Sequence, residues 1–266
     1  MDALKAEFEN FDFSYLEYRK MDHAHLKRHI QPTYEILLVT EGEIDYAIEE
    51  KSYSLAKGDL LLIRPAKYHF VRDIVKAPYQ RYCFHFSPKF VGDDGLVQEV
   101  FARGEKFTLP NGSKTETLIS VLKDLLTELP HAKRLSLCQS LFRSILLSLL
   151  TLDAQPNEKQ NETAGKCWAI LDYINVNLTA INTAEDIANG LFFSKSHLNH
   201  LFKKELNISV MQYIRNKKLM LAHKWISEGE KPTEIFVKCG FSNYATFYRA
   251  YYQYFGHSPS DTKKKK

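Results

Sequence analysis

The stretch Thr183-Ala-Glu-Asp-Ile-Ala188 leads into Asn189-Gly-Leu-Phe-Phe193 and then into Ser194-Lys-Ser-His-Leu-Asn-His-Leu-Phe-Lys-Lys204. Thr183 can cap a helix, with an acidic residue three positions later as in a capping box. Gly190 can turn the chain with a positive φ. Leucine and phenylalanine then recur at helical spacing in the last segment. The stretch therefore predicts a short helix, a tight turn and a second helix, which together form a helix-turn-helix unit.

The same plan returns about 50 residues later. Pro232-Thr-Glu-Ile-Phe236 suits the first turns of a helix, Gly240 can turn the chain, and Asn243 can cap a second helix that reaches Phe255. Between the two units, Val210 to Glu228 carries apolar residues at helical spacing. It predicts one connecting helix of about 28 Å, at about 1.5 Å per residue.

Two such units at a separation set by one helix suit successive major grooves, which lie about 34 Å apart. From Gly165 to the C-terminus there are 15 Lys and Arg against 8 Asp and Glu, whereas the rest of the chain has 21 against 24. A basic segment suits neutralisation of phosphates. The segment is expected to bind double-stranded DNA; the alternative is a generic helical bundle with a solvated surface.

This half of the chain resembles the AraC/XylS family of bacterial transcription regulators. The resemblance rests on Ile187-Ala188, Ser194 with Leu198 and Leu201-Phe202-Lys203, Leu219 with Ala222, Ile235, Gly240-Phe241, Phe247 with Arg249, and Gly256 with Ser258-Pro259-Ser260. The chain departs from the family pattern at Lys218, at Phe236 and at Thr262-Lys263. Phe236 is bulky for a helix crossing, so the second unit is expected to pack unusually there.

The resemblance also implies which side chains contact DNA. Base edges are expected to be read by Ser196, His197, Asn199 and His200 in the first unit and by Tyr244, Ala245, Thr246 and Arg249 in the second. Arginine can pair with guanine and asparagine with adenine. Lys203 and Lys204 are better placed for phosphate. The four lysines that end the chain are a further candidate for phosphate contact.

The N-terminal part has short apolar runs separated by turn signals. The expected strands are Tyr34–Thr40, Ile44–Glu49, Tyr53–Leu55, Leu60–Arg64, Phe70–Val75 and Tyr82–Phe86, with Leu4–Tyr18 as a further strand or arm. Turn residues stand between them, as at Glu41-Gly42-Glu43, Lys57-Gly58-Asp59 and Ala77-Pro78. This spacing predicts an antiparallel sandwich or barrel.

This part resembles the cupin-type sensor domain of the same family, through Glu35 with Gly42 and through Gly58-Asp59 with Pro65 and His69. Metal-binding cupins carry two histidines just before that glutamate, where this chain has His29 and Gln31. The resemblance thus makes His29, Gln31, Glu35 and His69 the candidate ligand-binding residues. Glutamine is a poor transition-metal ligand, so a polar pocket without metal is expected. A three-residue metal set and ordinary structural polar residues are the alternatives.

Helical periodicity follows, with one apolar stripe from Leu118 to Leu129 and another from Leu135 to Leu152. The two helices are expected to form a hairpin. Ile145 to Leu150 is apolar nearly all round, so a second contact is expected there, which in this family is a dimer; the alternative is that one subunit uses both faces. The polar segment after it predicts a flexible linker.

The expected architecture is a multidomain α+β chain. Residues 1–95 form a cupin-like antiparallel barrel, 96–152 a dimerising helical hairpin, 153–164 a linker and 165–266 an all-α domain with two helix-turn-helix units. The four cysteines are far apart and form no CxxC pair, so they predict buried thiols in a reducing compartment. The start of the chain lacks the apolar core of a signal peptide, and the longest apolar run is too short to span a bilayer.

These observations predict a cytoplasmic, ligand-responsive transcription regulator. Its expected partners are promoter DNA, a small-molecule effector such as a sugar or related metabolite, a second copy of the chain and RNA polymerase. No cofactor and no catalytic residue is expected, because no nucleophilic set or phosphate loop has a recognisable signature. Two alternatives stay open: a metal-dependent cupin enzyme fused to a DNA-binding domain, and a regulator whose barrel binds a protein.

Overall fold

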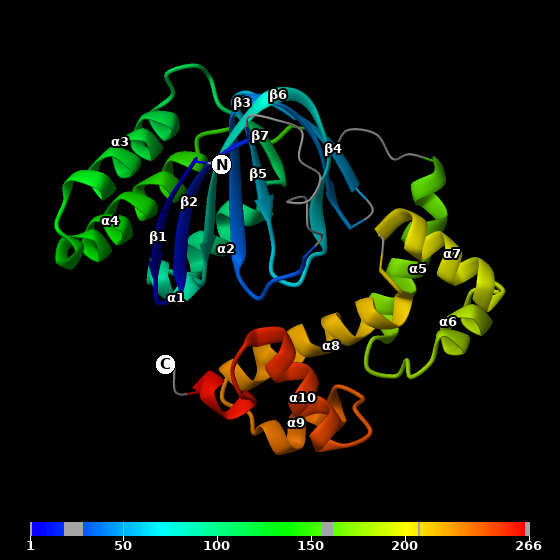
Figure 1. Cartoon of the computed structure of the whole chain (residues 1–266). Helices are drawn as coiled ribbons and strands as arrows, with labels where there is room; N and C mark the ends of the chain where they lie inside the picture. The colour runs from blue at the N-terminus through cyan, green and yellow to red at the C-terminus, as the bar shows by residue number, and fades with distance from the viewer. Residues whose placement is uncertain (1, 19–28, 50, 156–161, 207, 264–266) are drawn as a thin grey trace. The chain divides into compact units, whose positions relative to one another are not determined.

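The computed structural model describes residues 2–18, 29–49, 51–155, 162–206 and 208–263 (Figure 1). Contacts divide the chain into two compact units. The N-terminal unit comprises residues 1–27 and 33–159, and the C-terminal unit comprises residues 28–32 and 160–266. The four C-terminal lysines largely fall outside the described residues, which end at Lys263. Within the described part of the chain, no helix has the length and apolar character needed to cross a bilayer.

The N-terminal unit is built on one antiparallel sheet. Its strands are β1 (Asp2–Phe8), β2 (Phe11–Tyr18), β3 (Tyr34–Ile48), β4 (Lys51–Ala56), β5 (Asp59–Ile63), β6 (His69–Phe86) and β7 (Lys106–Thr108). They are ordered β1-β2-β6-β3-β5-β7, and β4 also pairs with β3. The prediction of an antiparallel β domain is confirmed.

Two strands are longer than the sequence predicted. The runs expected on either side of Glu41-Gly42-Glu43 form the single strand β3, and those around Ala77-Pro78 form the single strand β6. These turn signals produce register shifts instead of turns. Gly42 has a φ of 84°, and a Cβ there would lie 2.5 Å from the carbonyl oxygens of Lys76 and Pro78. Close approach of two strands at a bulge explains this glycine.

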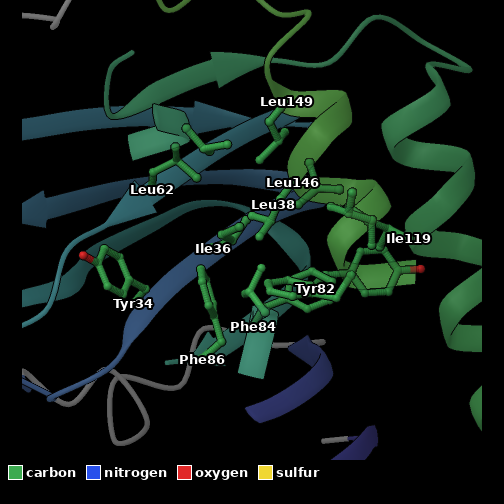
Figure 2. Close-up of a cluster of buried hydrophobic side chains, with 14 of the residues drawn as sticks. Tyr34, Ile36, Leu38, Leu62, Tyr82, Phe84, Phe86, Ile119, Leu146 and Leu149 are labelled. Carbon is green, nitrogen blue, oxygen red and sulfur yellow. The ribbon is translucent and has the colours of Figure 1, made fainter. Parts of the chain in front are cut away.

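One face of the sheet is covered by helices. These are α1 (Pro88–Val91), α2 (Asp94–Ala102), α3 (Lys114–Glu128) and α4 (His131–Leu149). Figure 2 shows Leu146 and Leu149 of α4 and Ile119 of α3 meeting aromatic and aliphatic side chains of the strands. The expected hairpin of two helices is present as α3 and α4. It lies against the sheet face that carries residues such as Ile36, Phe84 and Phe86.

The segments that follow α2 and α4 contain secondary structure that the sequence did not predict. β7, which the sequence did not predict, adds to the edge of the sheet at β5. The backbone amide of Gln155 donates to the carbonyl of Lys106 at 2.8 Å, so the start of the expected linker pairs with β7. At the other end, helix α5 (Glu162–Asn177) begins three residues before the expected domain start.

The C-terminal unit is helical, and the two predicted helix-turn-helix units are confirmed. The first consists of α6 (Ala184–Gly190) and α7 (Lys195–Leu206), and the second of α9 (Pro232–Lys238) and α10 (Tyr244–Phe255). Between them runs α8 (Val210–Ser227), as expected for the connecting helix, and the short 3-10 helix η2 (Pro259–Lys263) follows α10.

Candidate functional site

The first helix-turn-helix unit is stabilised by the local interactions expected from the sequence, except at Gly190. Asp186 and Thr183 form a capping box, in which Asp186 Oδ2 accepts from the backbone amide of Thr183 at 2.9 Å. Gly190, however, does not have a positive φ. The left-handed residue of the turn is Phe192, with φ 56°. Gly190 is required for packing instead, because a Cβ there would lie 2.3 Å from the Tyr173 hydroxyl on α5.

The first unit presents its expected DNA-contacting residues to solvent. Ser196, His197, His200, Lys203 and Lys204 are exposed and Asn199 is half-buried. The opposite face of α7 is buried through Leu198, Leu201 and Phe202. The amide nitrogen of Asn199 donates to the carbonyl of Lys195 at 3.0 Å, so this side chain is partly used within its own helix.

The second unit has the same arrangement. Asn243 caps α10 by accepting from the backbone amide of Thr246 at 2.8 Å. Ala245, Thr246 and Arg249 are exposed and Tyr244 is half-buried, whereas Phe247 and Tyr251 are fully buried. The guanidinium of Arg249 forms no ion pair or hydrogen bond with any described residue.

Two residues that depart from the family pattern have visible roles here. The Phe236 ring packs edge-on against Tyr244, with centroids 5.7 Å apart. Thr262 is buried, and its hydroxyl lies 2.7 Å from that of Tyr251, which in turn lies 2.7 Å from Nδ1 of His223. Burial raises the pKa of Tyr251 to about 12. The tyrosine therefore stays a neutral hydrogen-bonding group.

A groove lies between the two helix-turn-helix units, and the side chain of Lys218 bridges them. The groove has a volume of about 730 Å³ and is lined by Thr179 to Asn182 from the loop before α6, by Arg215 and Lys218 from α8, and by Gly240 to Ser242 with Thr246 from the second unit. Lys218 Nζ donates to the carbonyl of Ile181 at 2.7 Å and to that of Gly240 at 3.3 Å. Burial lowers the pKa of Lys218.

The N-terminal unit holds a polar cluster on the sheet face opposite the helices. The register of β3 and β6 places Glu35 opposite His85, with Cys83 two residues earlier on the same face. Glu35 Oε2 lies 2.9 Å from His69 Nε2 and 3.4 Å from His85 Nε2. The Cys83 thiol donates to Glu35 Oε1 at 3.1 Å, and its sulfur lies 3.6 Å from His85 Nε2.

Burial and charge both act on this cluster. Glu35, His69 and Cys83 are buried, whereas the His85 side chain is 26% exposed. Burial opposes ionisation of Glu35, but His69 and His85 outweigh it and hold the carboxyl pKa well below its usual range. Burial also opposes the charged form of His85, but Cys83 and Glu35 raise its pKa to about 11. Burial, followed by Glu35, raises the pKa of the Cys83 thiol.

Of the expected ligand-binding residues, Glu35 and His69 come together in this cluster. His29 is exposed and Gln31 is half-buried. Sequence reasoning missed Cys83, His85 and Arg81. Tyr79, Arg81, Cys83 and His85 alternate along β6, and this period of two could have placed their side chains on one face of the sheet.

Two buried polar atoms on this face lack a hydrogen-bond partner among the described residues. They are the hydroxyl of Tyr79 and Nε of Arg81, which lie near enough for the Arg81 side chain to oppose the rise in the Tyr79 pKa but form no well-aligned hydrogen bond. Buried polar groups in folded proteins are nearly always paired, and an unpaired one costs about 1–3 kcal/mol. The face therefore carries unused hydrogen-bonding capacity.

Comparison with known proteins identifies both units. The family described as "AraC-like ligand binding domain" matches residues 10–151, more than half of the chain, and "Helix-turn-helix domain" matches residues 187–265. These matches define a DNA-binding transcriptional regulator with a ligand-binding domain. The chain belongs to the AraC family of transcriptional regulators.

Individual relatives are distant. The chain is 23% identical over 265 residues to the Msm operon regulatory protein of Streptococcus mutans, covering 97% of this chain and 95% of that one. It is 31% identical over 153 residues to the probable transcriptional regulator LumQ of Photobacterium leiognathi, covering 56% of this chain and 59% of the relative. The structure of ToxT from Vibrio cholerae bound to an unsaturated fatty acid matches with a TM-score of 0.39 and 12% identity over 97% of this chain and 96% of that one.

Proposed function

We propose that this regulator binds one operator with both recognition helices and that a polar small molecule bound in the N-terminal unit controls this binding. The proposal of DNA binding rests on the amphipathic character of the recognition helices α7 and α10. Leu198 and Phe202 of α7 and Phe247 and Tyr251 of α10 are buried, while polar and basic side chains face solvent together with Tyr248 and Tyr252 of α10. Such a surface has the charge and hydrogen-bonding groups that DNA recognition needs.

We assign the base contacts to Ser196, His197, Asn199, His200, Tyr244, Ala245, Thr246 and Arg249. Arg249 is the strongest candidate, because its guanidinium is exposed, forms no ion pair or hydrogen bond with a described residue and can pair with a guanine. Lys203 and Lys204 contact phosphate, and Arg215 in the groove between the units is placed to do the same. Selection of binding sites from random DNA, followed by affinity measurements at several salt concentrations, tests this assignment. Binding without sequence preference would contradict it.

For the effector, the unpaired hydroxyl of Tyr79 and Nε of Arg81 support a ligand that accepts hydrogen bonds. A sugar hydroxyl or a carboxylate oxygen satisfies both atoms. A thermal-shift screen with monosaccharides and small carboxylic acids tests this: a ligand at a hundred times its Kd adds about 2.7 kcal/mol of stability. Arg81→Met should abolish the shift. If no small molecule stabilises the protein, a sensor unit that binds a protein becomes the better interpretation.

For assembly, the outer face of α4 supports a homodimer. It carries Ser136, Ser140, Ser144 and Leu147, of which Leu147 is 49% exposed, and also the exposed Arg143, whose guanidinium pairs with Asp93 at 3.0 Å. The hydroxyls of Ser140 and Ser144 donate to the carbonyls one turn earlier, at 3.0 and 3.1 Å. Their polarity is satisfied within the helix, so a second helix can cover them without leaving unpaired donors.

The apolar segment Ile145 to Leu150, expected from the sequence to form the dimer contact, is only partly available for it. Leu146, with Ile145 and Leu149, is fully buried within its own subunit, so this part of the apolar segment is used by the sheet. We further propose that the protein is not an enzyme, works in the cytoplasm, where bacterial DNA is found, and contacts RNA polymerase at its promoters. A DNA-dependent pull-down of RNA polymerase by the full-length protein tests the last point.

A further inference from the structure

We propose that Glu35, Cys83 and His85 form a binding site for one divalent transition-metal ion of the Zn²⁺ class. The site lies in the N-terminal unit, where β3 and β6 pair. It goes beyond the DNA contacts and the polar effector proposed above. It also differs from the set expected from the cupin resemblance, with which it shares Glu35 alone.

The first reason is the spacing of the three ligand atoms, which all lie within 4.8 Å of one another. Zinc binds nitrogen and carboxylate oxygen at about 2.0–2.2 Å and sulfur at about 2.3 Å. In a tetrahedron, these bonds separate oxygen from nitrogen by about 3.4 Å and sulfur from nitrogen by about 3.6 Å. Glu35 Oε2 lies 3.4 Å from His85 Nε2, and Cys83 Sγ lies 3.6 Å from the same nitrogen.

The remaining distance, between the Cys83 sulfur and the Glu35 carboxylate, requires an adjustment on metal binding. Cys83 Sγ lies 3.1 Å from Glu35 Oε1, because the thiol donates a hydrogen bond to that oxygen. The oxygen nearest His85 is Oε2 and not Oε1, so a metal that replaces the thiol proton needs a rotation of the Glu35 carboxylate that brings a single oxygen to bond length. This rotation is a change of side-chain torsion at Glu35, and the strands carrying Glu35 and Cys83 are held by the ladder of β3 and β6.

The second reason is the chemistry of the donors. A thiolate, an imidazole and a carboxylate suit zinc and its neighbours in the transition series, whereas magnesium and calcium prefer oxygen alone. Three protein ligands leave a fourth position, which water or another ligand can fill. The partly exposed side of His85 gives this position a path to solvent.

The third reason is the support around the ligands. His69 Nε2 contacts Glu35 Oε2 at 2.9 Å, and His69 Nδ1 lies 2.8 Å from the carbonyl of Lys67. The fully buried His69 is therefore held by the backbone and in turn orients the carboxylate. Metal-binding carboxylates and histidines are usually oriented by such outer hydrogen bonds.

Cobalt provides the test, because a cysteine thiolate bound to Co²⁺ gives a charge-transfer absorption in the near ultraviolet. The full-length protein, freed of metal by a chelator and kept reduced with a non-thiol reductant, is titrated with Co²⁺ in the absence of DNA. We expect one equivalent to produce the band and Zn²⁺ to remove it. Cys83→Ser should abolish the band, and His85→Gln should weaken Co²⁺ binding at least tenfold.

The matched control is Cys138→Ser, which alters a buried thiol of the same unit outside the cluster and should keep the band. If Cys83→Ser fails to fold, His85→Gln still tests the site, because a substitution at the partly exposed His85 is expected to disturb the fold less. No band in the wild type, a band that survives Cys83→Ser, or unchanged Co²⁺ affinity in His85→Gln would overturn the metal site. None of these outcomes affects the DNA contacts, which are measured separately.

Discussion

Lys218 and Gly240 meet where the two helix-turn-helix units join. The ammonium of Lys218 donates to the Gly240 carbonyl at 3.3 Å and to the Ile181 carbonyl at 2.7 Å, one in each half of the C-terminal unit. A Cβ on Gly240 would lie 2.7 Å from that ammonium and 2.4 Å from the carbonyl oxygen of Thr179. The contact holds the two recognition helices in one orientation, on which the predicted DNA binding depends.

Gly240→Ala should therefore destabilise the C-terminal unit more than a glycine substitution at a similar backbone angle elsewhere. Gly256 is the matched control, because its φ is 73° against 74° for Gly240 and no atom lies within 4 Å of its would-be Cβ. Gly256→Ala should cost about 1–2 kcal/mol for the left-handed backbone alone. Gly240→Ala should cost at least about 2 kcal/mol more, because it also clashes.

Both tryptophans of the chain, Trp168 and Trp225, belong to the C-terminal unit, so urea unfolding followed by tryptophan fluorescence reports on it selectively. Equal losses of stability in the two glycine variants would show that the contact with Lys218 and Thr179 is loose.

The capping box of α6 should make the C-terminal unit sensitive to acid. Backbone amides of Asn182 and Thr183 hydrogen-bond the Asp186 carboxylate and lower its pKa. A carboxyl whose pKa is lower in the folded than in the unfolded state stabilises the fold above its unfolded pKa of about 4. This contribution is lost as the pH falls through the folded pKa.

The tryptophan-monitored stability of the wild type should accordingly fall below about pH 4, and that of Asp186→Asn should fall less over the same interval. At neutral pH, Thr183→Ala should cost about 1 kcal/mol through loss of the cap. Identical acid profiles for wild type and Asp186→Asn would assign the acid sensitivity to other carboxyl groups.

Arg249 and Lys204 should differ in what they contribute to DNA binding. Arg249→Ala should cost about 1–3 kcal/mol and relax the preference at one base pair, because arginine pairs with guanine at the base edge. Lys204→Ala should weaken binding to all sequences alike and flatten the salt dependence, because lysine contacts phosphate. Binding-site selection with wild type and both variants measures this. An unchanged sequence preference in Arg249→Ala would show that Arg249 does not read a base.

Two neighbouring leucines of α4 should separate folding from association. Leu146 is fully buried in its own subunit, so Leu146→Glu should destabilise the N-terminal unit by several kcal/mol through an unpaired buried charge. Leu147 is 49% exposed, so Leu147→Glu should leave the fold intact and weaken the proposed dimer. Circular dichroism and sedimentation of the full-length variants distinguish the two effects. A monomeric wild type at high micromolar concentration would rule out this dimer.

The C-terminal unit could be predicted almost entirely from the sequence, because its information is local. Capping by Thr183 and Asn243 and apolar residues at helical spacing act within a few positions of each other. The exposed faces of α7 and α10 followed from that spacing. The role of Gly190 did not, because it depends on Tyr173 from α5, a helix that the sequence analysis had not predicted.

The tertiary structure alone decided the polar cluster of the N-terminal unit. Glu35 and Cys83 are 48 residues apart, and they meet because β3 and β6 run as two long paired strands through positions that look like turns. Sequence alone therefore determined the antiparallel β class and the pair of helix-turn-helix units, since both follow from local periodicity. Strand register determined which side chains share a site, and register depends on pairing between distant segments.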